Sequence, residues 1–192
     1  MLCTDVPVVL PLLRENIAHN APKLPYSSGA IQVRELDWTT PPEQWIWDDP
    51  RVVASPRTRE CTSPVPDDET PASDPDFLLA PPFDLIITAD TLYSPELVDP
   101  LLRTLRALIV VSTTLERSPQ SFLALERRDP ALIDGALKAA SDKWGMVYKR
   151  VPHRRLAKAL EKGGTTWLRE DWEGVEVWEV ALSPVTAAYK PV

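Results

Sequence analysis

The chemistry of this sequence is concentrated in a short polar segment that contains Asp90 and Tyr93 and follows a nearly continuous apolar run, Phe83, Leu85, Ile86 and Ile87. A carboxylate can receive a cation, and a phenol three positions later can face that cation with its ring or its hydroxyl group. The apolar run is typical of a parallel strand covered on both faces, beyond whose carboxyl end ligands bind. A turn capped by Asp90, with Tyr93 covering the edge of the sheet, explains an isolated D-x-x-Y equally well.

Two further acidic positions follow expected strands. Asp5 comes after a strand expected at 2–4, and Asp37 with Trp38 comes after a strand expected at 30–36. An acid at the end of a strand can bind both hydroxyl groups of a ribose, and an aromatic ring beside an aspartate can stack on an adenine whose amino group donates to the aspartate. Together with the D-x-x-Y segment, these positions indicate a nucleoside site at the carboxyl edge of a sheet.

Alternating strand and helix patterns position these residues. They predict an α/β fold with a Rossmann-like, doubly wound and mostly parallel sheet. Asp99 and Pro100 are expected to begin the central helix, because Pro100 would interrupt a helix that started at Pro95. The other elements are expected as helices within 6–20 and 130–144, and as strands beginning at 109–112 and lying at 146–148 and 174–182.

The length of 192 residues predicts one domain at 1–183, followed by a loose C-terminal tail at 184–192. A proline-rich segment at 48–82 carries eight acidic residues against three arginines, which predicts a disordered insertion. A solvated loop is favoured over a partner-binding role for this insertion. The basic stretch at 149–162 is interpreted as a solvated helical face, with guidance of an acidic partner as the alternative.

Composition argues against several classes of function. The net charge of -7 disfavours a nucleic-acid backbone as the main partner. The two cysteines and two histidines lack metal-ligand spacing, and no apolar run has the length of a membrane span. We therefore expect no metal, no nucleic acid and no membrane, and a monomer in the cytoplasm.

Four pieces of the chain, in this order, resemble one known family: TDVPVVLPLLRENIAHN, RELDW, FDLIITADTLY and WEGVEVWEV. The resemblance is to the seven-strand (class I) S-adenosylmethionine-dependent methyltransferases, and among them to the protein-lysine methyltransferases with a D-x-x-Y motif. The fungal elongation-factor methyltransferases belong to this group. The resemblance covers nearly the whole chain. It implies S-adenosyl-L-methionine as cofactor and a protein lysine as the acceptor, with a translation elongation factor as the suggested substrate.

The resemblance implies catalytic roles for Asp90 and Tyr93, which would line the channel of the target lysine beside the methyl group. Many methyltransferases that act on nitrogenous bases have an Asn/Asp-Pro-Pro-aromatic motif at this place. The present chain has Asp90-Thr91-Leu92-Tyr93 instead, which favours a protein lysine over a small molecule or a nucleic acid.

Cofactor binding is implied for Asp5 at the ribose, for Asp37 and Trp38 at the adenine, and for Ala89. Family members have, before the first of these positions, a strand that ends in a glycine-rich loop against the methionine portion of the cofactor. This chain has six glycines and none before Gly29. We therefore expect an N-terminally incomplete sheet that lacks its central strand. The alternative function is a non-catalytic, methyltransferase-like scaffold or binding module.

Overall fold

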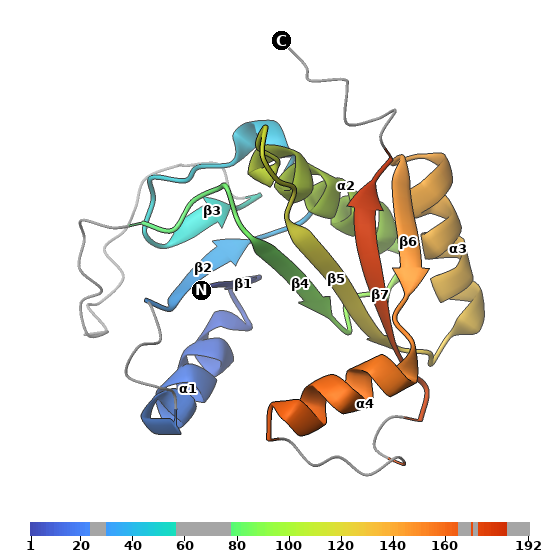
Figure 1. The fold of residues 1–192 in the computed structure, drawn as a ribbon. Helices are drawn as coiled ribbons and strands as arrows, with labels where there is room; N and C mark the ends of the chain where they lie inside the picture. Colours follow the sequence, from blue (N-terminus) through green and yellow to red (C-terminus); the bar gives the residue numbers. More distant parts are fainter. Residues whose placement is uncertain (24–29, 57–77, 165–169, 171–172, 184–192) are drawn as a thin grey trace. The chain divides into compact units, whose positions relative to one another are not determined.

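The computed structural model describes residues 1–23, 30–56, 78–164, 170 and 173–183 (Figure 1). The chain divides into two compact units, Met1–Ala80 and Pro81–Val192, and each is described by itself. Both units combine strands with helices, so the fold class is α/β. The predicted C-terminal tail lies outside the described residues.

The first unit is built on a parallel sheet with the strand order β1-β2-β3. Helix α1 packs on β1 and β2, and its apolar residues Leu10, Leu13 and Ile17 are buried or half-buried, as their helical spacing predicts. The elements of this unit are β1 (Leu2–Asp5), α1 (Leu10–Asn20), the 3-10 helix η1 (Ala21–Lys23), β2 (Gln32–Leu36), the 3-10 helix η2 (Pro42–Gln44) and β3 (Val52–Ala54).

Strand β3 corrects part of the prediction of a disordered insertion at 48–82. Val53 is fully buried, and Val53 and Ala54 form an apolar cluster with Leu36 of the neighbouring strand. The carboxylate of Asp49 accepts hydrogen bonds from the backbone N–H groups of residues 51 and 52, at 2.8 and 3.1 Å, and so fixes the start of β3. Charge and proline counts missed this short apolar pairing. Residues 57–77 of the insertion lie outside the described residues.

Arg34 of β2 is fully buried. It forms hydrogen bonds with the chain on both sides of residues 57–77. Its guanidinium donates to the backbone oxygens of Trp47, at 3.1 Å, Asp49, at 3.4 Å, and Leu79. It also donates to the side-chain oxygen of Gln32 at 2.8 Å, and that oxygen accepts the N–H of Leu79 at 2.9 Å. Burial lowers the pKa of Arg34, and the charge of Asp49 opposes this effect. We call these five residues the Arg34 clasp.

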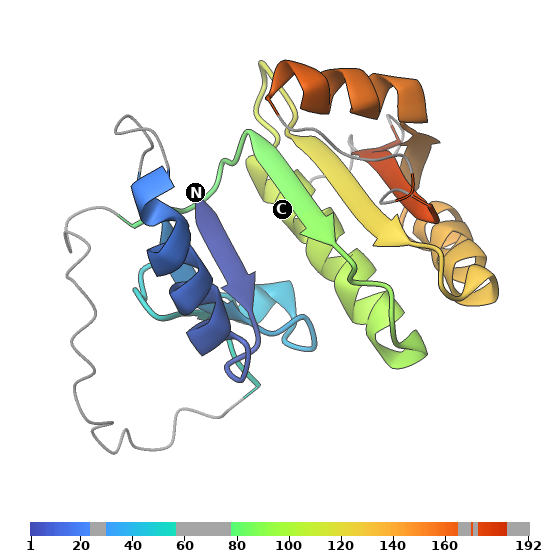
Figure 2. The same ribbon diagram turned by 90° about the horizontal axis from the view of Figure 1, so that it is seen from below.

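The second unit contains a mixed sheet with the order β4-β5-β7-β6, in which β4 and β5 are parallel and β7 runs antiparallel to both of its neighbours. Helices α2 and α3 lie on one side of this sheet, and α4 lies on the other (Figure 2). Its elements are β4 (Leu85–Ala89), α2 (Pro95–Ser112), β5 (Gln120–Glu126), α3 (Pro130–Asp142), β6 (Met146–Arg150), α4 (His153–Lys162) and β7 (Val175–Leu182).

Helix α2 differs from the prediction at both ends. It begins at Pro95 and includes Pro100, whose missing N–H would have bonded the carbonyl of Glu96. That carbonyl lies in the first turn of the helix, and Glu96 is exposed, so water can replace the lost N–H donor. The helix then continues to Ser112, so the strand expected at 109–112 is wrong. Ile109 lies on the same buried face as the preceding leucines, because helical packing outweighs the β propensity of Ile-Val-Val.

Within the second unit, strand β4 is packed on one face only, whereas a strand covered on both faces was predicted. Ile86 is buried, but Leu85 and Ile87 are 51% and 62% exposed. Alternate residues of a strand point to opposite faces, and only one face of β4 is packed within the second unit. Among the described strands, β4 is also an edge of its sheet.

Helix α3 and strands β6 and β7 confirm the predictions, whereas strand β5 was not predicted. Helix α3 begins as expected after Asp129, whose carboxylate accepts the N–H of Leu132 at 3.0 Å. Strands β6 and β7 are found where they were predicted. Helix α4 has no buried residue, and its cationic side chains are exposed, which fits a solvated helical face. Among the helices of the described ranges, none combines the length and the apolar composition needed to cross a bilayer.

Candidate functional site

Asp5 and Asp37 lie at the same edge of the first sheet. Asp5 ends β1 and is the register partner of Glu35 in β2, and Asp37 follows two residues later. Because β1 and β2 are parallel, their carboxyl ends meet at one edge, where ligands of such sheets bind. The carboxylate of Asp5 accepts the N–H of Val6 at 2.8 Å and is half-buried.

The local structure fixes the carboxylate of Asp37. Its Oδ1 accepts both the backbone N–H and the hydroxyl group of Thr39, at 2.8 and 2.6 Å. Its own N–H donates to the carbonyl of Ala54 at 3.0 Å. Trp38 is half-buried and packs against the apolar cluster that includes Leu36. These contacts form a local turn and hold both side chains in place, whatever they bind.

Asp90 ends β4 in a sharp turn. Its N–H donates to the carbonyl of Ala124 in β5 at 2.9 Å, and its φ of 53° lies in the left-handed region. Aspartate is one of the few residues other than glycine that adopt this conformation readily. Ala89, at the end of the strand, is exposed beside it. The turn therefore places the Asp90 side chain at the carboxyl edge of the second sheet.

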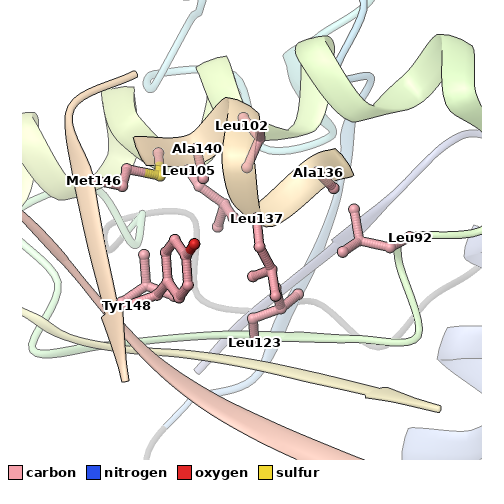
Figure 3. A pocket seen from close by; sticks show the side chains of 10 residues that line it. Leu92, Leu102, Leu105, Leu123, Ala136, Leu137, Ala140, Met146 and Tyr148 are labelled. Carbon is pink, nitrogen blue, oxygen red and sulfur yellow. The ribbon is translucent and has the colours of Figure 1, made fainter. Parts of the chain in front are cut away.

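Leu92 anchors the turn that carries Asp90 and Tyr93. It is buried among apolar side chains of α2, α3, β5 and β6, as Figure 3 shows. The space left between these side chains has a volume of about 10 Å³ and an entirely apolar lining. A cavity of this size holds at most one water, so it is a packing space and not a ligand site. With Leu92 fixed inside, Asp90 and Tyr93 remain outside, and Tyr93 is 65% exposed.

Arg128 pairs with Asp90, and sequence reasoning missed this contact. Its Nη2 lies 3.4 Å from Asp90 Oδ2 and 2.5 Å from Glu126 Oε2, while its Nε donates to the same Glu126 oxygen at 2.7 Å. The hydrogen bond to Glu126 and then the charge of Asp90 raise the pKa of Arg128. The signal was present as Glu126-Arg127-Arg128 after an apolar strand, but the sequence analysis placed that strand at 109–112 and so gave no reason to join Arg128 to Asp90.

The next residue along, Arg127, is held by a separate ion pair in the second unit. Its Nε and Nη2 donate to the two carboxylate oxygens of Glu176 at 3.0 and 3.2 Å. Glu176 is buried in β7 and also pairs with Arg150 at 3.2 Å and accepts the indole N–H of Trp178 at 3.1 Å. Burial alone would raise the pKa of Glu176, but these hydrogen bonds and charges outweigh it, so the pKa lies below its ordinary value.

The stability of the second unit should fall in acid because of Glu176. A lowered folded-state pKa stabilises the protein above the ordinary glutamate pKa, about 4.3, and this contribution is lost as the pH falls through the folded-state pKa, at about 1.4 kcal/mol per unit of lowering. We expect the free energy of unfolding of Glu176→Gln, measured in urea, to fall less steeply than that of the wild type between about pH 6 and about pH 3. Glu179→Gln, at an exposed position of the same strand, is the control. Equal pH slopes in the two variants would contradict the prediction.

The six predicted site residues fall into two sets. Asp5, Asp37 and Trp38 belong to the first unit, and Ala89, Asp90 and Tyr93 belong to the second. Within each unit the predicted residues lie at the carboxyl ends of parallel strands. The described part of the chain has no group of three or more histidine, cysteine, aspartate or glutamate side chains arranged to hold a metal ion.

No protein-family model matches the chain, and no curated protein matches it.

Proposed function

We propose that the protein is an S-adenosylmethionine-dependent protein-lysine N-methyltransferase with a Rossmann-like fold, as the resemblance stated above implies. The observation that carries the proposal is the anchored turn after β4. Leu92 is buried, and it leaves a carboxylate and a phenol, Asp90 and Tyr93, exposed at the carboxyl edge of a parallel strand pair. A translation elongation factor in the cytoplasm is the substrate that the resemblance suggests.

The side chains of Asp5, Asp37 and Trp38 in the first unit fit the nucleoside half of the cofactor. Asp5 uses one carboxylate oxygen in one local hydrogen bond, and Asp37 uses one carboxylate oxygen in two. A carboxylate has two oxygens with about four acceptor positions, so both retain capacity for the ribose hydroxyls and the adenine amino group. Trp38 would pack on the base.

The residues of the second unit fit the acceptor side of the reaction. When bound, S-adenosylmethionine supplies an electrophilic methyl group on a sulfonium centre. Asp90 receives the lysine ammonium by charge and hydrogen bonding and orients the amine after it loses its proton. Tyr93 provides an aromatic wall that attracts the cation and excludes water from it. The rest of the catalytic effect is positioning of the amine.

A second candidate is a non-catalytic, methyltransferase-like binding module. The observation that favours it is that both key carboxylates already have partners, since Asp37 bonds Thr39 and Asp90 pairs with Arg128. In this reading the acidic side chains stabilise turns and a surface ion pair, and they bind no cofactor.

Calorimetric titration of the 192-residue chain with S-adenosylmethionine separates the two candidates. The enzyme should bind, and Asp37→Asn should weaken binding about tenfold or more, because a hydrogen bond to a charged group contributes about 1.5–3 kcal/mol. Asparagine retains an oxygen that accepts from Thr39, but its NH₂ group would face the adenine amino group. Two hydrogen-bond donors would then face each other and form no hydrogen bond. Asp48→Asn, at an exposed position of the same unit, is the matched control.

Transfer of a labelled methyl group to lysines of a purified elongation factor completes the test. Cofactor binding together with labelled lysine supports the enzyme. Absence of cofactor binding by the chain would contradict the enzyme and favour the non-catalytic module. Cofactor binding with label on another kind of acceptor would overturn the lysine assignment.

A further inference from the structure

The pair formed by Arg128 and Asp90 has the chemistry of an enzyme–substrate contact. A guanidinium with a charge of +1 lies 3.4 Å from the carboxylate to which the proposed function assigns the lysine ammonium. The side chains are 67% and 53% exposed, so another cation can reach the same carboxylate from solvent.

We propose that Arg128 is a positioning residue whose guanidinium pairs with Asp90 while no substrate is bound. A cationic side chain of the substrate then enters by replacing this guanidinium at Asp90. The inference rests on the assignment of Asp90 in the proposed function. The charge of Asp90 is then compensated both before and after the exchange. A neutral side chain cannot replace the ion pair, so Arg128 disfavours uncharged acceptors relative to cations, by roughly the two- to fivefold expected for an exposed ion pair.

The geometry shows which of the two contacts of Arg128 gives way. The guanidinium holds Glu126 through Nε at 2.7 Å and Nη2 at 2.5 Å, whereas Asp90 is held through Nη2 alone at 3.4 Å. The longer and single contact is the weaker one. Arg128 therefore releases Asp90 and keeps Glu126.

The backbone around Arg128 limits how far its side chain can move. Its N–H donates to the carbonyl of Glu126, and the N–H of Arg127 donates to the carbonyl of Gly174, both at 2.8 Å. The neighbouring side chain of Arg127 is fixed on Glu176. Arg128 therefore remains beside the site after the exchange and can return to Asp90 when the product leaves.

The test measures the binding of n-butylammonium chloride, a lysine side-chain analogue, at the Asp90 carboxyl carbon by nuclear magnetic resonance of the full chain. The signal is assigned by its loss in Asp90→Asn. Arg128→Gln should bind the analogue roughly two- to fivefold more tightly, the range expected for loss of an exposed ion pair. Arg128→Lys restores a competing cation and should return the affinity to near the wild-type value.

The matched control is Arg117→Gln. Arg117 forms another exposed ion pair with Asp84, next to the other end of β4, at 2.6 Å. It changes the net charge by the same amount without touching Asp90, and its affinity for n-butylammonium should equal that of the wild type. An Arg128→Gln affinity equal to or lower than that of the wild type would overturn the inference, as would an equal gain in Arg117→Gln.

Methyl-transfer kinetics distinguish failure of the inference from failure of the proposed function. In an active enzyme, Arg128→Gln should lower KM for the protein substrate by the same factor, and the change should fall on KM rather than on kcat. Turnover with an unchanged KM contradicts only the inference. If Arg128→Gln binds n-butylammonium more tightly than the wild type but the protein transfers no methyl group, the cation site is supported and the proposed reaction is contradicted.

Discussion

Arg34→Met should lose about 3 kcal/mol of the unfolding free energy of the first unit. Hydrogen bonds from a charged donor contribute about 1.5–3 kcal/mol each, and the substitution leaves the carbonyls of Trp47, Asp49 and Leu79 without this donor. Relief from burying a charge offsets part of the loss. Urea unfolding followed by hydrogen exchange in peptides from residues 30–56 measures the effect in this unit.

The control for this prediction is Arg51→Met, which makes the same chemical change at an exposed arginine of the same unit. It should change the unfolding free energy by less than about 0.5 kcal/mol. If Arg34→Met were as stable as Arg51→Met, the clasp would contribute nothing, and the chain around residues 47 and 79 would be held by other contacts.

Asp90→Asn should reduce methyl-transfer turnover about a hundredfold or more and leave cofactor affinity unchanged. A positioned group that manages a proton contributes roughly 10²–10⁴ in rate, and the neutral amide neither pairs with the ammonium nor aids loss of its proton. Asparagine adopts a φ near 53° as readily as aspartate does, so the turn and its bond to Ala124 are retained. Labelled methyl transfer and calorimetry measure the two effects.

Asp84→Asn is the matched variant, because Asp84 is an exposed carboxylate directly before β4 and pairs with Arg117. It should retain full turnover. Equal turnover in Asp90→Asn and the wild type would remove Asp90 from the reaction. A loss of cofactor binding in Asp90→Asn would instead show that the residue contacts the cofactor.

The sequence predicted the parts of the fold that depend on local pattern. Asp129 followed by proline marks the start of α3, because the cap and the fixed proline φ are local properties. The acidic residues at the ends of β1 and β4 were placed at sheet edges for a similar reason, since an apolar run stops at each.

The predictions from sequence were wrong or incomplete where tertiary packing determines the local structure. The segment Ile109-Val110-Val111 reads as a strand, but burial of Ile109 beside the leucines of α2 makes it helical. An apolar run also cannot tell whether one face of β4 or both are covered. The contact between Arg128 and Asp90 depends on which strand lies beside β4, and no local pattern contains that information.

The exposed apolar face of β4 has a consequence for solubility. A short β-prone segment with Leu85 and Ile87 exposed, at an edge of its sheet, has the character of an aggregation-prone stretch. Asp84 and Asp90 flank this segment, each in an ion pair with an exposed arginine. Charged side chains at both ends of an edge strand disfavour its pairing with a second copy. In the proposed enzyme, Asp90 would then contribute to both methyl transfer and colloidal stability, and neutralising substitutions at this position would be selected against on two grounds.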